Sequence, residues 1–281
     1  MRAACTLLAI LAVSASASTQ PTFSSRVDGI RVDVLVTDST RRPVRDLTAG
    51  EFSIRDNGIP QQVDVVSYGD VALNVGLAFD LSESVAGARL EQLRTASKAL
   101  SAELRPADQS ALITFDEVVL LRCPLSLDRG CIDRELAAAA PRGRTALIDG
   151  ILAGLIAGES DVGRSLLMVF SDGFDTASFL GAERVLEMGR RSDVVVYPIT
   201  SKGTRPDFVE DLATVTGGRL HEVNRTDDLS STFRTILDEF RHRYLVTYTP
   251  RNVVQGGWHT LDVRVSRPGA RVKARPGYRG H

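Results

Sequence analysis

The sequence lacks the features that identify nucleic-acid-binding, membrane-spanning and zinc-binding proteins. Its formal net charge is −1, and Lys and Arg form neither a stripe nor a block, which argues against nucleic acid or an anionic membrane surface as a partner. No two of the four histidines (His221, His242, His259 and His281) have zinc-ligand spacing on one helix. After the first residues, no stretch is apolar and long enough to span a bilayer. The 281 residues are nevertheless 43% hydrophobic, which suffices for a sizeable core.

Cysteine is also scarce, and the first of the three cysteines lies in a predicted secretory signal peptide, residues 1–17. Met1-Arg2 is a short charged start, residues 7–13 are almost purely apolar, and Ala15-Ser16-Ala17 supplies the small residues that a signal peptidase needs. The apolar run is too short to cross a membrane, and Cys5 comes too early for a lipoprotein cysteine. A buried N-terminal strand or helix is the alternative. The signal interpretation predicts a secreted or periplasmic protein.

The two remaining cysteines, Cys123 and Cys131, are candidates for a disulfide, because an even number of cysteines in an exported chain allows one. The enclosed loop is short, so such a bond would mainly brace local structure. Two unpaired thiols are the alternative. A metal site is less favoured, because no histidine or second cysteine pair lies nearby with ligand spacing.

The two ends of the chain have β-type patterns and are predicted to form one small domain together. Within residues 24–70, apolar and polar residues alternate from Ile30 to Val36, and Asp56-Asn57-Gly58 is a tight-turn signal. Residues 242–281 return to alternation, with Trp258 expected as a core anchor. Each end alone has few strands and exposed edges, so we expect them to pack as a β-sandwich-like domain. The arginines of the C-terminal region are expected to be solvated: Arg241, Arg243, Arg264, Arg267, Arg271 and Arg275.

The middle of the chain, residues 71–241, has the pattern of an α/β domain. Continuous apolar runs at Leu73–Phe79, Leu166–Phe170 and Val194–Ile199 are typical of strands that are buried on both faces. Amphipathic helical segments separate these runs. The alternation predicts a doubly wound, mostly parallel sheet with helices on both faces.

Side chains with oxygen atoms follow the predicted strands of this domain. The first buried strand leads into Asp80-Leu81-Ser82-Glu83-Ser84, and the second into Ser171-Asp172-Gly173; Thr145 lies just ahead of a predicted helix. Ligands of open α/β sheets bind beyond the carboxyl ends of the strands, so these loops are expected to meet. A ligand set made only of oxygen suits a divalent cation, Mg²⁺ first and Mn²⁺ or Ca²⁺ next.

At these residues the sequence resembles the von Willebrand factor A family and its metal-ion-dependent adhesion site. The resemblance covers roughly residues 73–240 and implies that Ser82 and Ser84 ligate the metal directly. Thr145 would ligate directly or through water, and Asp80 and Asp172 largely through water. It also implies a protein partner that offers an acidic side chain, and no enzymatic activity. The flanks are similar to a group of exported bacterial proteins of this family, known chiefly from Acidobacteria-type genomes.

Other interpretations of the same residues remain open. Ser82, Ser84 and Thr145 are also suitable helix caps, and a structural scaffold with a vestigial metal site is an alternative function. A phosphatase of the haloacid dehalogenase type would need a second aspartate where Ser82 stands, and Lys202 is the only lysine in a late loop. A serine hydrolase is weaker, because no Gly-x-Ser-x-Gly elbow is present. Asp116 and Asp175 are expected to be solvated loop residues.

Overall fold

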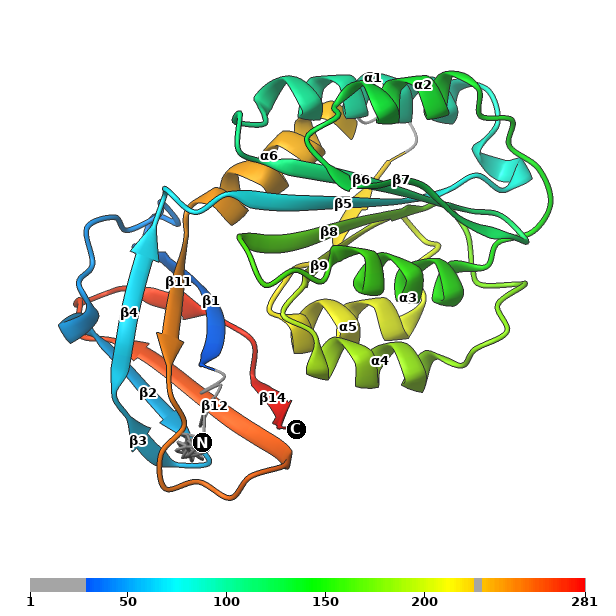
Figure 1. The fold of residues 1–281 in the computed structure, drawn as a ribbon. Helices are drawn as coiled ribbons and strands as arrows, with labels where there is room; N and C mark the ends of the chain where they lie inside the picture. Colours follow the sequence, from blue (N-terminus) through cyan, green and yellow to red (C-terminus); the bar gives the residue numbers. More distant parts are fainter. Residues whose placement is uncertain (1–28, 225–228, 281) are drawn as a thin grey trace, which may run out of the picture.

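The computed structural model describes residues 29–224 and 229–280, which form two domains side by side (Figure 1). The predicted signal peptide and the first residues of the N-terminal β segment lie outside the described residues. One domain is a layered α/β structure, and the other consists of two antiparallel sheets. Within the described part of the chain, no helix combines the length and the apolar character needed to cross a membrane.

The α/β domain is built on a six-stranded sheet in the order β10-β9-β8-β5-β6-β7. Its neighbours pair in parallel, except that the edge strand β7 runs antiparallel to β6. The strands are β5 (Leu73–Asp80), β6 (Gln109–Phe115), β7 (Val119–Ser126), β8 (Arg164–Ser171), β9 (Val195–Ser201) and β10 (His221–Val223).

Helices cover both faces of this sheet, which confirms the predicted fold class. On one face lie α1 (Ala88–Glu103), α2 (Gly130–Ala137) and α6 (Leu229–Arg241); on the other lie α3 (Leu147–Gly158), α4 (Ala182–Arg191) and α5 (Asp207–Thr216) (Figure 1). In β8, Met168 and Phe170 enter the first core, whereas Leu167 and Val169 enter the second. Because both faces are buried, the strands appear in the sequence as unbroken apolar runs.

The predicted disulfide is present in this domain. It joins Cys123 of β7 to Cys131 of α2, across eight residues of sequence. The bond fastens the edge strand to the helix that packs beside it.

The second domain combines strands from both ends of the chain in each of its two sheets. The first sheet has the order β13-β1-β11-β4 and the second β14-β12-β2-β3. The N-terminal strands are β1 (Ile30–Thr37), β2 (Phe52–Asp56), β3 (Ile59–Gln61) and β4 (Val63–Tyr68), with a short 3-10 helix at Ala49–Glu51. The C-terminal strands are β11 (Arg243–Tyr248), β12 (Gly257–Val265), β13 (Arg271–Lys273) and β14 (Gly277–Gly280).

A buried carboxylate, Asp56, fastens this domain from the inside. It accepts hydrogen bonds from the hydroxyls of Tyr248 (2.9 Å) and Tyr278 (2.8 Å) and lies 2.8 Å from Nδ1 of His259. These partners stand on β11, β14 and β12, while Asp56 ends β2 ahead of the tight turn at Asn57-Gly58, where both φ angles are positive. One side chain thus connects four strands from both sheets.

Trp258 and two of the C-terminal arginines differ from expectation. The Trp258 side chain is 39% exposed and lies against Arg190 of α4, so the prediction of a core anchor is wrong. Arg243 is fully buried and Arg275 nearly so, which contradicts their expected solvation. Arg243 begins β11 and Arg275 lies between β13 and β14; both side chains are covered by the α/β domain, where Arg243 donates to the carbonyl of Gly217 and Arg275 to the carbonyl of Arg190. Arg264 is solvated as expected.

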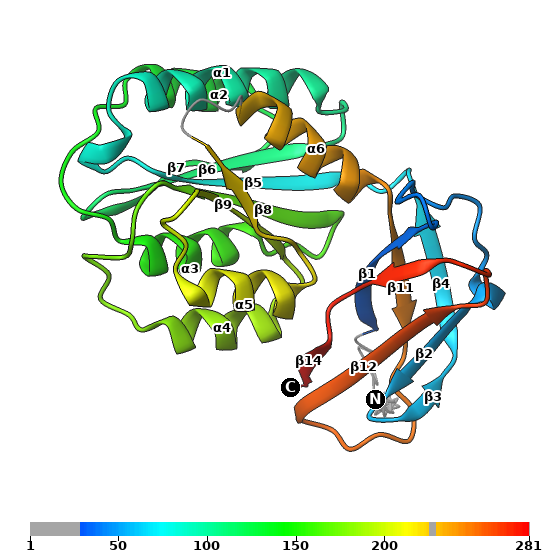
Figure 2. The same ribbon diagram turned by 180° about the vertical axis from the view of Figure 1, so that it is seen from behind.

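Another buried arginine, Arg164 at the start of β8, holds the junction between the domains. Its guanidinium pairs with Asp33 of β1 at 2.6 Å and donates to the carbonyls of Phe240 (2.9 Å) and Arg243 (3.0 Å). It also lies 4.6 Å from the centre of the Phe240 ring. Since α6 leads directly into β11 (Figure 2), this side chain binds both the end of the helix and the start of the strand.

Replacing Arg164 by Leu is expected to lower the free energy of unfolding by about 3–5 kcal/mol, because Asp33 is left as a buried, unpaired charge. The double variant Arg164→Leu/Asp33→Leu should recover most of this loss, since removing both charges of a buried pair is often neutral. Arg264→Leu, which breaks an exposed ion pair, should change the stability by less than about 1 kcal/mol. Urea unfolding would measure all three, and equal losses for the single and double variants would contradict the account.

Candidate metal centre

The predicted metal ligands lie at the edge of the sheet that faces away from the small domain (Figure 1). Asp80 is the last residue of β5, and Asp172 directly follows β8, the neighbouring parallel strand. Thr145 lies in the loop before α3. The carboxyl ends of adjacent parallel strands therefore bring the three predicted loops to one place.

Four of the five predicted residues form one hydrogen-bonded chain. Asp80 is buried, and its Oδ1 accepts a hydrogen bond from the backbone N–H of Ser82 at 2.8 Å. The hydroxyl oxygens of Ser82 and Ser84 are 3.1 Å apart, and Ser84 donates to Oδ1 of Asp172 at 2.6 Å. Two carboxylates and two hydroxyls are thus gathered at one place.

Thr145 is the fifth residue, and its backbone is fixed by the loop that follows Asp172. Its N–H donates to the Thr176 hydroxyl (3.1 Å), and its carbonyl accepts from the N–H groups of Thr176 and Ala177. Its hydroxyl makes no hydrogen bond to any residue within the described ranges. That oxygen would lie 3.8 Å from a Cβ atom placed on Gly173, so it faces the turn that carries Asp172.

Helix capping does not explain these side chains. The helix α1 begins after Gly87 and α3 after Ala146, and neither start has a side-chain capping bond from the N-cap residue. Ser82 precedes the short 3-10 helix Glu83–Val85 without such a bond. Asp175 instead accepts from the N–H of Ile148 near the start of α3, so Asp175 has a structural role rather than the solvated position expected from the sequence.

Two further residues, which were not predicted as part of the metal site, lie at the centre. Ser171, the last residue of β8, donates to Oδ2 of Asp80 at 2.7 Å, so both oxygens of that carboxylate accept hydrogen bonds. Lys202, just after β9, lines a cavity of about 560 Å³ together with Ser84, Asp172, Ser201, Thr204 and Asn224. Their place at the site could have been predicted, because each stands at or just after the carboxyl end of a predicted strand.

The electrostatics of the centre favour a cation. Burial raises the pKa of the Asp80 carboxyl; hydrogen bonds from Ser171 and Ser82 offset part of this rise, and the nearby charge of Asp172 adds to it. Among the described residues, no Lys, Arg or His forms an ion pair with either carboxylate. A buried anion without a counter-charge is costly, and a divalent cation would supply that charge.

The donor set also limits which ions fit. The described ranges hold no cluster of three or more His, Cys, Asp or Glu side chains suited to a metal, so a centre here must use hydroxyls as well as carboxylates. The three hydroxyls and two carboxylates provide hard oxygen donors, which suit Mg²⁺, Mn²⁺ or Ca²⁺.

No protein-family model and no curated protein matches this sequence, but solved structures share its fold. Proximal thread matrix protein 1 of the mussel byssus, solved with zinc in its MIDAS motif, gives a TM-score of 0.56 at 16% identity, over 67% of this chain and 50% of that chain. An aerotolerance-related membrane protein from Bacteroides fragilis gives 0.50 at 20% identity, over 60% and 98%. A PilB minor pilin variant from Streptococcus sanguinis gives 0.50 at 14% identity, over 63% of each chain.

Asp80→Asn is expected to raise the melting temperature of the metal-free protein by about 2–4 °C, equivalent to about 1 kcal/mol, because it removes a buried charge without changing the shape. Ser171→Ala should act in the opposite direction, since the same carboxylate then loses a hydrogen bond. Calorimetry in the presence of a chelator measures both. A clear loss of stability in Asp80→Asn would show that the carboxylate is already well compensated.

Proposed function

Because the α/β domain has the fold of a von Willebrand factor A-type domain, we propose that the protein is a divalent-cation-dependent protein-binding module. The observation that carries the proposal is the group formed by Asp80, Ser82, Ser84 and Asp172. It gathers two carboxylates and two hydroxyls at the ligand-binding edge of the sheet, and among the described residues no Lys, Arg or His forms an ion pair with either carboxylate, although Lys202 lines the same cavity.

Each residue of the group has a role that follows from its position. Ser82 and Ser84 present adjacent hydroxyl oxygens, and Thr145 presents a third that has no hydrogen-bond partner among the described residues. Asp80 and Asp172 supply negative charge; Asp80 accepts from the backbone N–H of Ser82, and Asp172 accepts from the Ser84 hydroxyl. Mg²⁺ is the preferred ion, with Mn²⁺ or Ca²⁺ as alternatives. A bound cation would supply an electrophilic coordination position for an acidic side chain of the ligand.

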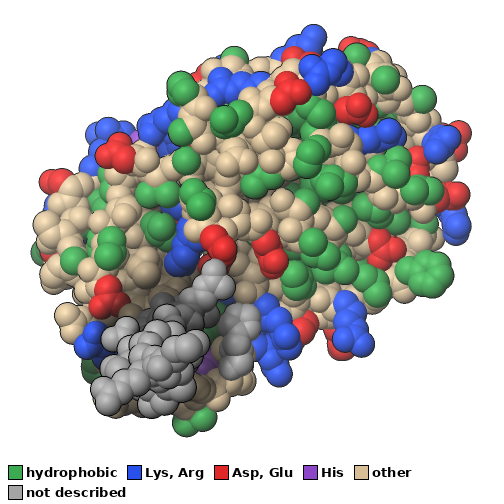
Figure 3. Space-filling model, viewed as in Figure 1, with side chains coloured by type: hydrophobic (Ala, Val, Ile, Leu, Met, Phe, Trp, Pro, Cys, Tyr) green, Lys and Arg blue, Asp and Glu red, His purple; other side chains and the backbone are tan. Residues whose placement is uncertain are grey.

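The surroundings favour a protein as that ligand. Phe174, Phe179 and Leu180 are exposed on the loop after Asp172, and Phe179 is 99% exposed. The loop is held in place, because the Asp149 carboxylate accepts from the N–H groups of Phe179 (2.8 Å) and Leu180 (3.1 Å). Apolar side chains presented on a fixed loop are typical of interfaces. Hydrophobic side chains also gather over the α/β domain in Figure 3.

An exported location accompanies this function. The disulfide between Cys123 and Cys131 is compatible with an oxidising compartment, and the sequence of residues 1–17 favours a signal peptide. We therefore assign the protein to the periplasm or the outside of the cell. The protein ligand is therefore expected in the same compartment.

The surroundings of Asp80 do not favour phosphatase chemistry. The carboxylate is buried and both of its oxygens accept hydrogen bonds, whereas a nucleophile needs a free oxygen that faces the substrate. The position of the second aspartate is taken by Ser82. Lys202 does line the neighbouring cavity, so turnover of an aryl phosphate that is lost in Asp80→Asn would overturn the binding-module proposal.

Titration of the chelator-treated protein with Mg²⁺ in a calorimeter should show one saturable site. Ser84→Ala should weaken the affinity at least about tenfold, or about 1.4 kcal/mol, because it removes a hydroxyl that faces both Ser82 and Asp172. Glu83→Gln is the matched control, since Glu83 is exposed and lies between the two serines; it should change the affinity by less than about threefold. The absence of Mg²⁺, Mn²⁺ and Ca²⁺ binding would favour a scaffold with a vestigial site.

A displayed library of random peptides tests the ligand class. Selection on the protein in Mg²⁺, with elution by a chelator, should enrich peptides that contain Asp or Glu, because a carboxylate can complete the coordination of the ion. The same selection on Ser84→Ala should show no such enrichment. Enrichment of acidic peptides that is equal in both proteins would contradict a metal-mediated contact.

A further inference from the structure

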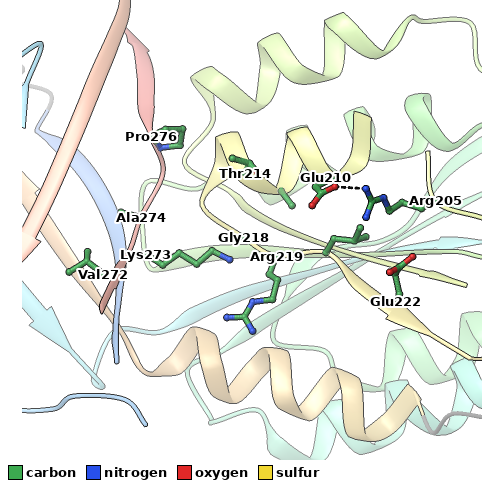
Figure 4. Close-up of a pocket in the computed structure, with 12 residues that line it drawn as sticks. Arg205, Glu210, Thr214, Gly218, Arg219, Glu222, Val272, Lys273, Ala274 and Pro276 are labelled. Carbon is green, nitrogen blue, oxygen red and sulfur yellow. Dashed lines mark ion pairs between the residues drawn. The ribbon is translucent and has the colours of Figure 1, made fainter. Parts of the chain in front are cut away.

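A second cavity lies at the junction of the two domains. It has a volume of about 570 Å³ and is lined on one side by α5 and β10, and on the other by β13 and the residues after it (Figure 4). We call it the interdomain cleft. Its charged lining residues are Arg205, Glu210, Arg219, Glu222 and Lys273.

Positive charge in the cleft is only partly neutralised. Arg205 pairs with Glu210 at 2.6 Å, so these two cancel. Arg219 pairs with Glu239 at 3.1 Å, but Glu239 also pairs with the buried Arg243 at 3.2 Å. The single carboxylate of Glu239 therefore neutralises two guanidinium groups only in part. The end of the cleft near Arg219 carries excess positive charge.

Lys273 adds to this surplus. Its side chain extends from β13 toward Gly218 and Arg219 of the α/β domain (Figure 4). Among the described residues, no carboxylate pairs with its ammonium group. Glu222 also lines the cleft and is drawn away from Lys273 in Figure 4.

The pKa of Lys273 reflects the same excess of positive charge. Burial, followed by repulsion from Arg243 and Arg219, lowers the pKa of the Lys273 ammonium group to about 8, although Glu239 partly offsets the effect. A cation in this position is stabilised by any anion that enters the cleft, since ion pairs gain strength where water is partly excluded.

We propose that the interdomain cleft binds a small oxyanion, a phosphate or carboxylate group, between the Lys273 ammonium and the Arg219 guanidinium. The two cations belong to different domains, so a bound oxyanion connects the α/β domain to the small domain. The Lys273 and Arg219 end of the cleft lies at the start of β10, whereas the candidate metal centre lies beyond the carboxyl ends of β5 and β8, and the two cavities share no lining residue. The proposal therefore does not rest on metal binding.

A purely structural role for Lys273 makes a different prediction. The segment around it packs against the end of α5, where Gly217 adopts a left-handed conformation, and a cation near a helix C-terminus stabilises that helix. A lysine that only serves the helix end would not respond specifically to added oxyanions.

Because the chain has few lysines, NMR can distinguish oxyanion binding at Lys273 from a purely structural role. The sequence has three lysines: Lys98, exposed on α1; Lys202, at the candidate metal centre; and Lys273. Reductive ¹³C-methylation keeps their charge and gives one NMR signal for each, which Lys→Arg variants assign. The methylated full chain is titrated with inorganic phosphate, and separately with succinate, in the presence of a chelator; sodium chloride at equal ionic strength is the reference.

The Lys273 signal is expected to shift and saturate with phosphate or succinate, while the Lys98 signal stays in place. Arg219→Gln should weaken this response about tenfold, because a charge-assisted contact is lost. Arg191→Gln is the matched control, since both side chains are 51% exposed and ion-paired; it should leave the response unchanged. The response should also survive in Asp80→Asn, which separates this site from the metal centre.

Several outcomes would overturn the proposal. A Lys273 signal that does not move, or that moves equally with sodium chloride, would leave Lys273 with its structural role alone. A saturable shift confined to Lys202 would place the oxyanion at the candidate metal centre. An unchanged response in Arg219→Gln would remove Arg219 from the site.

Discussion

The relative position of the two domains depends on the buried guanidinium of Arg164. It stands at the first residue of β8 and holds Asp33 of the small domain as well as the carbonyls of Phe240 and Arg243 where α6 passes into β11. A buried charge is tolerated only with a full set of partners in fixed geometry, so the junction has little freedom. The same strand ends at Ser171, beside the candidate metal centre. One strand of fixed length therefore sets the separation between the junction and the centre.

The candidate metal centre requires a carboxylate at the end of an apolar strand of the hydrophobic core, where burying a charge lowers stability. The apolar strand β5 buries its last residue, Asp80, as completely as the residues before it. Ser171, on the neighbouring strand, and the backbone of Ser82 supply hydrogen bonds but no opposite charge. The fold thus maintains a negative site at some loss of stability, as is common where a function requires a charge. The divalent cation that we propose for this site would offset this loss.

Much of this architecture could be predicted from the sequence, because it follows from local patterns. The unbroken apolar runs identified the buried strands, and topology then placed Asp80, Thr145 and Asp172 at one edge. The burial of Arg243 and Arg275 and the exposure of Trp258 could not be predicted. Alternation along a strand shows which way a side chain points, but not whether a second domain covers it. Lys202 was judged only for its fit to a phosphatase, so its place beside Asp172 was missed.

The continuity of the chain at the junction has a consequence for biosynthesis. The α/β domain is inserted between β4 and β11, and these two strands pair directly, with Tyr68 opposite Tyr244. Strands β1 to β4 therefore leave the ribosome well before the partners that complete both of their sheets. Domains generally fold as units during synthesis, in order from the N-terminus. Here the order is reversed: the inserted domain can fold first, and its folding brings the two halves of the outer domain together.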